Sequence, residues 1–180
     1  FTLTVNFERM IGRRIPPADM ARWVECIALD GGMRPFEEMQ RLEASPTTQM
    51  VLIHDASRQR LENFAPGKYA DELHGQAFTG RLGEFAFTCI SPEGFTTCEA
   101  LLEETLQLAL QADDVKRIMV VPNAEREGTY DSLRRLLRDA PEGKTVTLFA
   151  MQPMPGGAFR QEILGYSLMQ ALGIRAEEIG

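Results

Sequence analysis

The chain has 180 residues, of which 44% are hydrophobic and 25% are charged. This length and composition are typical of one globular domain and exclude a disordered chain. The formal net charge of −7 at pH 7 opposes general binding to nucleic acid, which depends on clustered lysine and arginine.

The first 45 residues predict one strand and two helices. Apolar and polar residues alternate over 1–7, which indicates a half-buried strand. Apolar residues at three- and four-residue spacing predict a helix over 17–30, which is ended by the glycine pair that follows it. A shorter helix is expected over 35–44, because Pro35 suits the first position of a helix.

Three unbroken apolar runs, at 50–53, 118–121 and 148–151, are the clearest signal in the chain. Such runs suit strands that are buried on both faces, and these strands are typical of a parallel sheet covered by helices. Apolar residues are scattered among charges from 55 to 80, where we expect only a short helix over 69–74.

A strand and a helix are predicted next. Apolar residues alternate over 84–90, which indicates a strand. Thr96 and Glu99 have the spacing of a capping box, in which both side chains cap the first turn of a helix. This helix is expected to end near Ala112. The leucines that it carries are Leu101, Leu102, Leu106, Leu108 and Leu110.

Two more helices complete the pattern. The first, from about Thr129, places leucines inward and Arg134, Arg135 and Arg138 outward. The second, over 158–172, is apolar around most of its circumference. This composition indicates either deep burial or contact with a partner.

These elements predict an α/β fold, with strand–helix repeats that are clearest over 82–173. We expect a single three-layer domain over 1–180, in which a central mixed, mostly parallel sheet carries helices on both faces. Ligands of such sheets bind beyond the carboxyl ends of the strands. A site is therefore expected in the segments that follow the three apolar runs.

His54, Asp55 and Ser57 follow the first run and are the candidate catalytic residues. His54 suits a general base near neutral pH, and Asp55 and Ser57 offer hard oxygen ligands for a divalent cation. The metal pattern is incomplete, because Gln59 stands where a second serine is needed, so we predict no metal site. The alternative is a local turn that Asp55 or Ser57 caps, with His54 at the margin of the sheet.

Asn123, Glu125 and Arg126 follow the second run and are candidate ligand-binding residues. The carboxylates of Glu125 and Glu127 oppose a phosphate here, so a cation or a basic protein surface fits better. The alternative is a charged loop that only contacts solvent.

Two further features each have two interpretations. Gly156 and Gly157 let backbone amides approach an anion, but the loop 152–157 has no lysine, serine or threonine and also fits a proline–glycine turn. The outward arginines at 134, 135 and 138 suit an acidic partner or a phosphate backbone, or they form a solvated helix face.

The sequence contains no H-E-x-x-H, C-x-x-C, G-x-S-x-G or P-loop motif, and we predict no cofactor. No apolar stretch approaches eighteen residues, so we expect no membrane span. The three cysteines are odd in number and lack C-x-x-C spacing, which fits a reducing compartment and predicts a cytoplasmic protein.

We therefore favour a small non-catalytic protein that acts by binding another protein, as a regulator, an inhibitor or an assembly subunit. The predicted interface is the helix 158–172, for a protein partner or a second copy, with neither nucleic acid nor membrane as a partner. The alternative is a small-molecule-binding enzyme, hydrolase-like, with its site around His54, Asp55 and the 123–127 loop.

Overall fold

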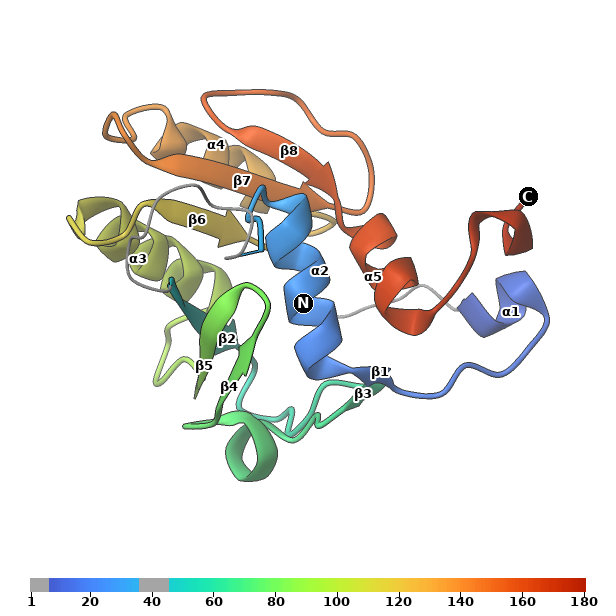
Figure 1. Ribbon diagram of the computed structural model, residues 1–180. Helices are drawn as coiled ribbons and strands as arrows, with labels where there is room; N and C mark the ends of the chain where they lie inside the picture. The colour runs from blue at the N-terminus through green and yellow to red at the C-terminus, as the bar shows by residue number, and fades with distance from the viewer. Residues whose placement is uncertain (1–6, 36–45) are drawn as a thin grey trace. The chain divides into compact units, whose positions relative to one another are not determined.

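The computed structural model describes residues 7–35 and 46–180, and Figure 1 shows their helices and strands. The chain folds into two compact units. One unit is Pro92–Gly165, and the other combines the described residues up to Ser91 with Tyr166–Gly180. The strand predicted over 1–7 and the helix predicted over 35–44 lie outside the described residues, apart from one residue at the margin of each.

The unit Pro92–Gly165 is built around a sheet of parallel strands. Its elements are α3 (Cys98–Gln111), β6 (Arg117–Val120), α4 (Thr129–Leu137), β7 (Thr145–Ala150) and β8 (Arg160–Ile163). The strand order is β6-β7-β8, and Thr147 of the central strand pairs with Met119 on one side and Arg160 on the other. Both strand predictions are confirmed, because β6 and β7 contain all but the last residue of the second and third apolar runs.

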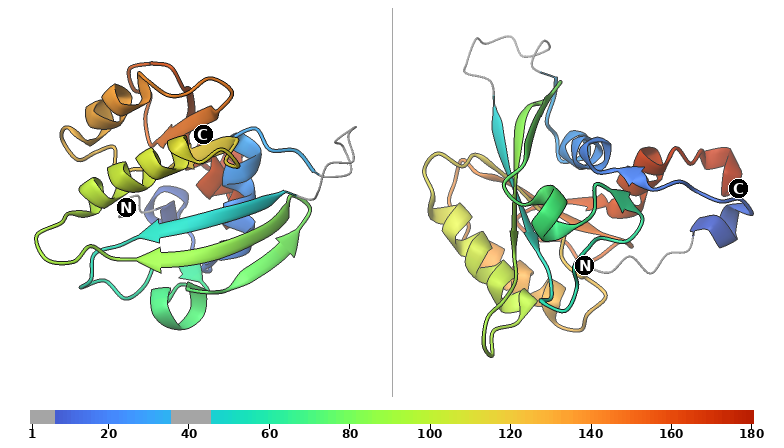
Figure 2. Two further views of the ribbon diagram at one scale, coloured as in Figure 1. Left: turned by 90° about the vertical axis from the view of Figure 1, so that its left-hand side faces the viewer. Right: turned by 90° about the horizontal axis from the view of Figure 1, so that it is seen from below.

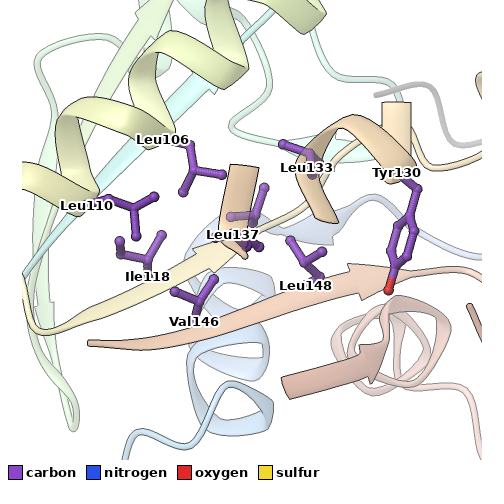
Figure 3. Packing of buried hydrophobic residues seen from close by; sticks show 9 residues of the cluster. Leu106, Leu110, Ile118, Tyr130, Leu133, Leu137, Val146 and Leu148 are labelled. Carbon is purple, nitrogen blue, oxygen red and sulfur yellow. The ribbon is translucent and has the colours of Figure 1, made fainter. Parts of the chain in front are cut away.

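The core of this unit lies between α3, α4 and one face of the sheet (Figure 3). Leu133 and Leu137 are one helical turn apart on α4, and both are fully buried. On α3, Leu106 and Leu110 are buried in the same way, whereas Leu108 is 64% exposed. The helical period turns Leu108 away from Leu106 and Leu110, so this apolar side chain lies on the outer face of α3.

The helix predicted over 158–172 is wrong in its first part. Residues Arg160–Ile163 form β8, and helix α5 extends only over Leu164–Leu172. Pairing with β7 satisfies the backbone of β8, and its polar residues are tolerated because β8 is an edge strand. Gly173 follows α5 with a φ of 69°, so the predicted end of the helix is confirmed.

The capping box predicted for α3 is wrong by one residue. The N-cap is Thr97, whose hydroxyl accepts the amide hydrogen of Ala100 at 3.1 Å. Thr96 therefore lies outside the helix. Glu99 is not at the third helical position, and its carboxylate instead forms an ion pair with Arg126.

The second unit contains the shorter elements. They are α1 (Phe7–Ile11), β1 (Ala18–Asp19), α2 (Met20–Asp30), β2 (Thr47–Ile53), β3 (Phe64–Ala65), the π-helix η2 (Tyr69–Leu73), β4 (Ala77–Gly80), β5 (Gly83–Ile90), most of α5, and the 3₁₀ helix η3 (Ala176–Glu178). Asp19 caps α2 by accepting the amide hydrogen of Arg22. The helix predicted over 17–30 is present from Met20, whereas Ala18–Asp19 forms β1, and the helix predicted over 69–74 is present as a π-helix.

Strand β2 confirms the first apolar run as a strand but not as a buried one. It pairs in parallel with β5, and β5 pairs in antiparallel fashion with β4 (Figure 2). Met50–Ile53 is only half-buried, since β2 is an edge strand of this sheet. On β5, Phe85 and Phe87 are buried, as the alternation predicts, and Phe78 of β4 stacks on Phe85 with ring centroids 5.0 Å apart.

The described strands form three sheets, β1-β3, β2-β5-β4 and β6-β7-β8, where the sequence predicts one. Parallel and antiparallel pairs both occur, which confirms the α/β class with mixed strand directions. The three-layer order stays a prediction. Within the described part of the chain, no helix has the length and apolar character needed to cross a membrane.

Candidate functional site

Asp55 and Ser57 form a tight turn after β2. One carboxylate oxygen of Asp55 accepts the Ser57 amide hydrogen at 2.8 Å and the Ser57 hydroxyl hydrogen at 2.6 Å. These two bonds, the hydroxyl bond first, hold the pKa of the Asp55 carboxyl below its ordinary value. The Ser57 hydroxyl is therefore oriented as a donor to Asp55, which is the geometry of a capped turn.

His54 is held by backbone and aromatic contacts. Its amide donates to the carbonyl of Ile90 at 3.0 Å, which continues the pairing of β2 with β5. Its ring stacks on Tyr69 with centroids 3.8 Å apart and planes at 6°. Ring atom Nδ1 lies 3.0 Å from the carbonyl oxygen of Asp55, and since a carbonyl only accepts, Nδ1 carries the hydrogen. The remaining nitrogen, Nε2, is the one with capacity to act as a base.

Asn123, Glu125 and Arg126 lie in the loop between β6 and α4. The Arg126 guanidinium pairs with Glu99 of α3 at 2.7 Å, and the Arg126 amide donates to the carbonyl of Asn123 at 3.2 Å. The side chain of Glu125 is exposed. This loop belongs to the unit Pro92–Gly165, whereas His54 belongs to the other unit. The predicted convergence of the two groups into one site stays a prediction.

A cleft forms where α4 faces the loop that precedes β8. It has a volume of about 340 Å³. Its lining residues are Asp131, Arg134, Arg135, Arg138, Gly156, Gly157 and Ala158, and we call it the arginine cleft. The amphipathic pattern of α4 explains the arginines: Leu133 and Leu137 face the core, so the polar positions between and beyond them face outward.

One arginine of α4 holds the loop close to this helix. The Arg134 guanidinium donates to the carbonyl oxygen of Gly156 from Nε at 3.1 Å and from Nη2 at 2.7 Å. Its Nη1 lies 3.4 Å from Asp131, one turn earlier on the helix. Within the loop, a Cβ atom on Gly157 would collide with the ring of Phe159, so any larger residue there would have to displace this ring.

The other two arginines of the cleft have no such partners. Within the described residues, the guanidinium groups of Arg135 and Arg138 make no hydrogen bond or ion pair, and both residues are exposed. Asp131 is the sole carboxylate among the lining residues, and Arg134 already pairs with it. Since a guanidinium presents a fork of donors that matches carboxylate and phosphate oxygens, the arginine cleft is suited to an anion.

Both halves of this cleft are visible in the sequence as separate features, and no sequence pattern joins them. The glycines at 156–157 lack a basic residue of their own, and the arginines on α4 resemble a solvated helix face. The structure brings them together because β8 lies beside β7, so that the loop passes over α4. The helix N-terminus expected at residue 158 is absent, since residues 160–163 form a strand.

No group of three metal-ligating side chains comes together in the parts of the chain that the structure describes. No curated protein and no solved structure matches the chain. A family model described as a family of unknown function, DUF6621, matches residues 1–179, and the chain belongs to this family.

Proposed function

We propose that this protein is non-catalytic and acts by binding another protein, as a regulator, an inhibitor or an assembly subunit, with the arginine cleft as the surface that receives an acidic group of the partner. The observation that carries the proposal is the pair Arg135 and Arg138, which line the cleft and make no ion pair with any residue that the structure describes. Arginine is enriched in protein interfaces and dominates many of them energetically.

The charge of the whole chain supports a local role for these arginines. With 26 acidic and 19 basic residues, the protein repels most polyanions at long range. The arginine cleft, with three guanidinium groups and one carboxylate, is therefore a locally positive site on a protein whose net charge is negative. A locally positive cleft of this kind favours a partner with a matching acidic group over non-specific attraction.

The enzyme alternative around His54, Asp55 and the 123–127 loop has less support. The Ser57 hydroxyl donates to Asp55, and the Arg126 guanidinium pairs with Glu99, so both groups already have partners. Only His54 retains a ring nitrogen that is suited to proton transfer. We keep the enzyme as the second proposal.

An interface on the C-terminal helix also has less support than its sequence suggests. Helix α5 is nine residues long, and Leu164, Leu168 and Ala171 are already buried within the chain. Tyr166 of the same helix is 66% exposed, so this large side chain remains accessible to a partner. A cytoplasmic location remains part of the proposal, and the three free cysteines are consistent with a reducing compartment.

The test is a comparison of partner binding by three forms of the full chain. The cleft variant is Arg135→Gln with Arg138→Gln. The control, Arg58→Gln with Arg81→Gln, removes the same charge from exposed positions in the other unit. Proteins retained from a lysate of its native cells are identified by mass spectrometry, purified, and titrated against each form by calorimetry.

We expect the cleft variant to bind the purified partner at least ten-fold more weakly, as the loss of two charge-assisted contacts implies, and the control to match the wild type. Equal binding by all three forms would place the interface elsewhere. A chain that retains no protein at all contradicts the proposed function.

A further inference from the structure

The composition of the arginine cleft restricts what can enter it. Its lining consists of four charged residues and three residues without a large side chain, Gly156, Gly157 and Ala158. Sites for nucleotides and other small organic ligands are lined mainly by apolar and aromatic side chains, which hold the body of the ligand. The arginine cleft offers no such surface. It is therefore suited to a small anionic group whose attached molecule is held by contacts outside the cleft.

The number and spacing of the donors favour a phosphate over a carboxylate. Arg135 and Arg138 are three residues apart, so they are neighbours on the surface of α4. Each presents a fork of N–H donors that no described residue occupies. A carboxylate, with two oxygens in one plane, is matched by a single fork. A phosphate monoester carries three acceptor oxygens and a charge between −1.5 and −2 at about pH 7, so it can accept from two guanidinium groups at once.

Arg134 and Asp131 set the position of such a group. Arg134 donates to the Gly156 carbonyl and pairs with Asp131, which fixes its position. Its guanidinium therefore holds the loop in place and also adds positive charge to the cleft. The Asp131 carboxylate, 61% exposed, repels an anion at its own end of the cleft. The anion is therefore expected beside Arg135 and Arg138. At the other end, Asp131 pairs with Arg134 through Oδ1, and its second carboxylate oxygen can accept a backbone N–H of a bound peptide.

We propose that the arginine cleft binds the phosphate of a phosphorylated serine or threonine in a partner protein. The inference rests on the proposed function and adds the chemical class of the group that is recognised. Binding is then switched on by the modification of the partner, because the unmodified hydroxyl carries neither the charge nor the acceptor oxygens that the two guanidinium groups need.

The test measures fluorescence anisotropy with labelled peptide pools on the full chain. The pools have randomised flanks and differ only in a central phosphoserine, serine or glutamate. Inorganic phosphate serves as a competitor, and single-stranded oligonucleotides serve as a fourth probe. The same cleft variant and charge-matched control are compared with the wild type, and circular dichroism checks that all three are folded.

We expect the phosphoserine pool to bind the wild type and the control within two-fold of each other, and the cleft variant at least ten-fold more weakly. Millimolar inorganic phosphate should displace the pool. The serine and glutamate pools should bind at least ten-fold more weakly than the phosphoserine pool.

Three results would overturn the inference. Equal binding of the glutamate and phosphoserine pools means that a carboxylate is sufficient. Inorganic phosphate that binds as tightly as the phosphopeptides means that the peptide contributes nothing. Oligonucleotide binding that is lost in the cleft variant means that the site is for nucleic acid.

Phosphatase treatment of the purified partner separates the two proposals. If treated partner still binds with the same dependence on the cleft, the proposed function stands and the phosphate inference is wrong.

Discussion

Arg134 donates two hydrogen bonds to the carbonyl oxygen of Gly156, from Nε at 3.1 Å and from Nη2 at 2.7 Å. These bonds join α4 to the connection between β7 and β8, which are parallel neighbours in one sheet. Parallel neighbours are usually joined by a helix. Residues 151–159, all of which the structure describes, contain none. Arg134 therefore holds in place a loop that lacks regular structure of its own.

The substitution Arg134→Gln should loosen this loop. Hydrogen bonds to a charged group contribute about 1.5–3 kcal/mol when buried, and Arg134 is 35% exposed, so we expect a loss of about 1–2 kcal/mol in the free energy of unfolding. Urea denaturation measures this loss, and hydrogen exchange of the Gly157 and Ala158 amides should become faster. Arg135→Gln is the control and should change neither quantity, because Arg135 makes no hydrogen bond or ion pair with the described residues.

The parallel sheet of the unit Pro92–Gly165 could be predicted because its strands are buried. Val146–Ala150 is apolar except for one threonine and buried throughout, so burial on both faces left a continuous run in the sequence. Strand β8 left no such signal. Its first residues, Arg160, Gln161 and Glu162, are polar, and an edge strand is specified by its neighbour's free backbone groups more than by its own side chains.

The candidate site was only partly predictable for a related reason. Each arginine on α4 could be placed outward from helical periodicity alone. Whether an outward arginine meets solvent or a cleft depends on the path of the 152–157 loop, and that path follows from the position of β8. The polar residues after the first two apolar runs were the more visible candidates, yet Ser57 and Arg126 have partners within their own units.

The N-cap of α3 provides a second test. Thr97→Ala removes the hydroxyl that accepts the Ala100 amide hydrogen, which leaves an orphan donor in the first turn. We expect a loss of about 1 kcal/mol in the free energy of unfolding, measured by urea denaturation. Thr96→Ala is the matched control, one residue away, and should have little effect. If the two variants lose equal stability, the cap is wrongly placed.

The pair Arg13 and Glu178 predicts a dependence of stability on pH. Arg13 donates to the two carboxylate oxygens of Glu178 at 2.7 and 3.2 Å, and the Arg175 amide donates at 2.8 Å. These bonds, the Arg13 bonds first, lower the pKa of Glu178 from 4.5 to about 2. A carboxyl group with a depressed pKa stabilises the fold above its unfolded pKa. That contribution is therefore present above pH 4.5 and lost as the pH falls towards 2.

Carbon-detected NMR titration of Glu178 measures this pKa directly. Arg13→Gln should raise it towards the ordinary value, because the main cause of the shift is removed. The stability difference between wild type and Glu178→Gln should be largest near neutral pH and vanish near pH 2. Because the pair is exposed to solvent, added salt should also reduce the difference. A Glu178 carboxyl that titrates at its ordinary pKa in the wild type would show that the pair does not form in solution.

Lys144 is expected to stabilise the unit Pro92–Gly165 through its bonds at the end of α3. Its ammonium donates to the carbonyl oxygens of Ala112 and of Val115, the latter at 2.7 Å, so it satisfies groups at and beyond the end of α3 and opposes the negative end of the helix dipole. Lys144→Met keeps the aliphatic chain and removes the charge. We expect a loss of about 2–3 kcal/mol in the free energy of unfolding, measured by urea denaturation.

Lys116→Met is the control, because Lys116 donates to one exposed carbonyl, that of Asp113. The free energy of unfolding should fall by less than about 1 kcal/mol in this variant. Similar losses for both variants would contradict a specific role for Lys144 at the end of α3.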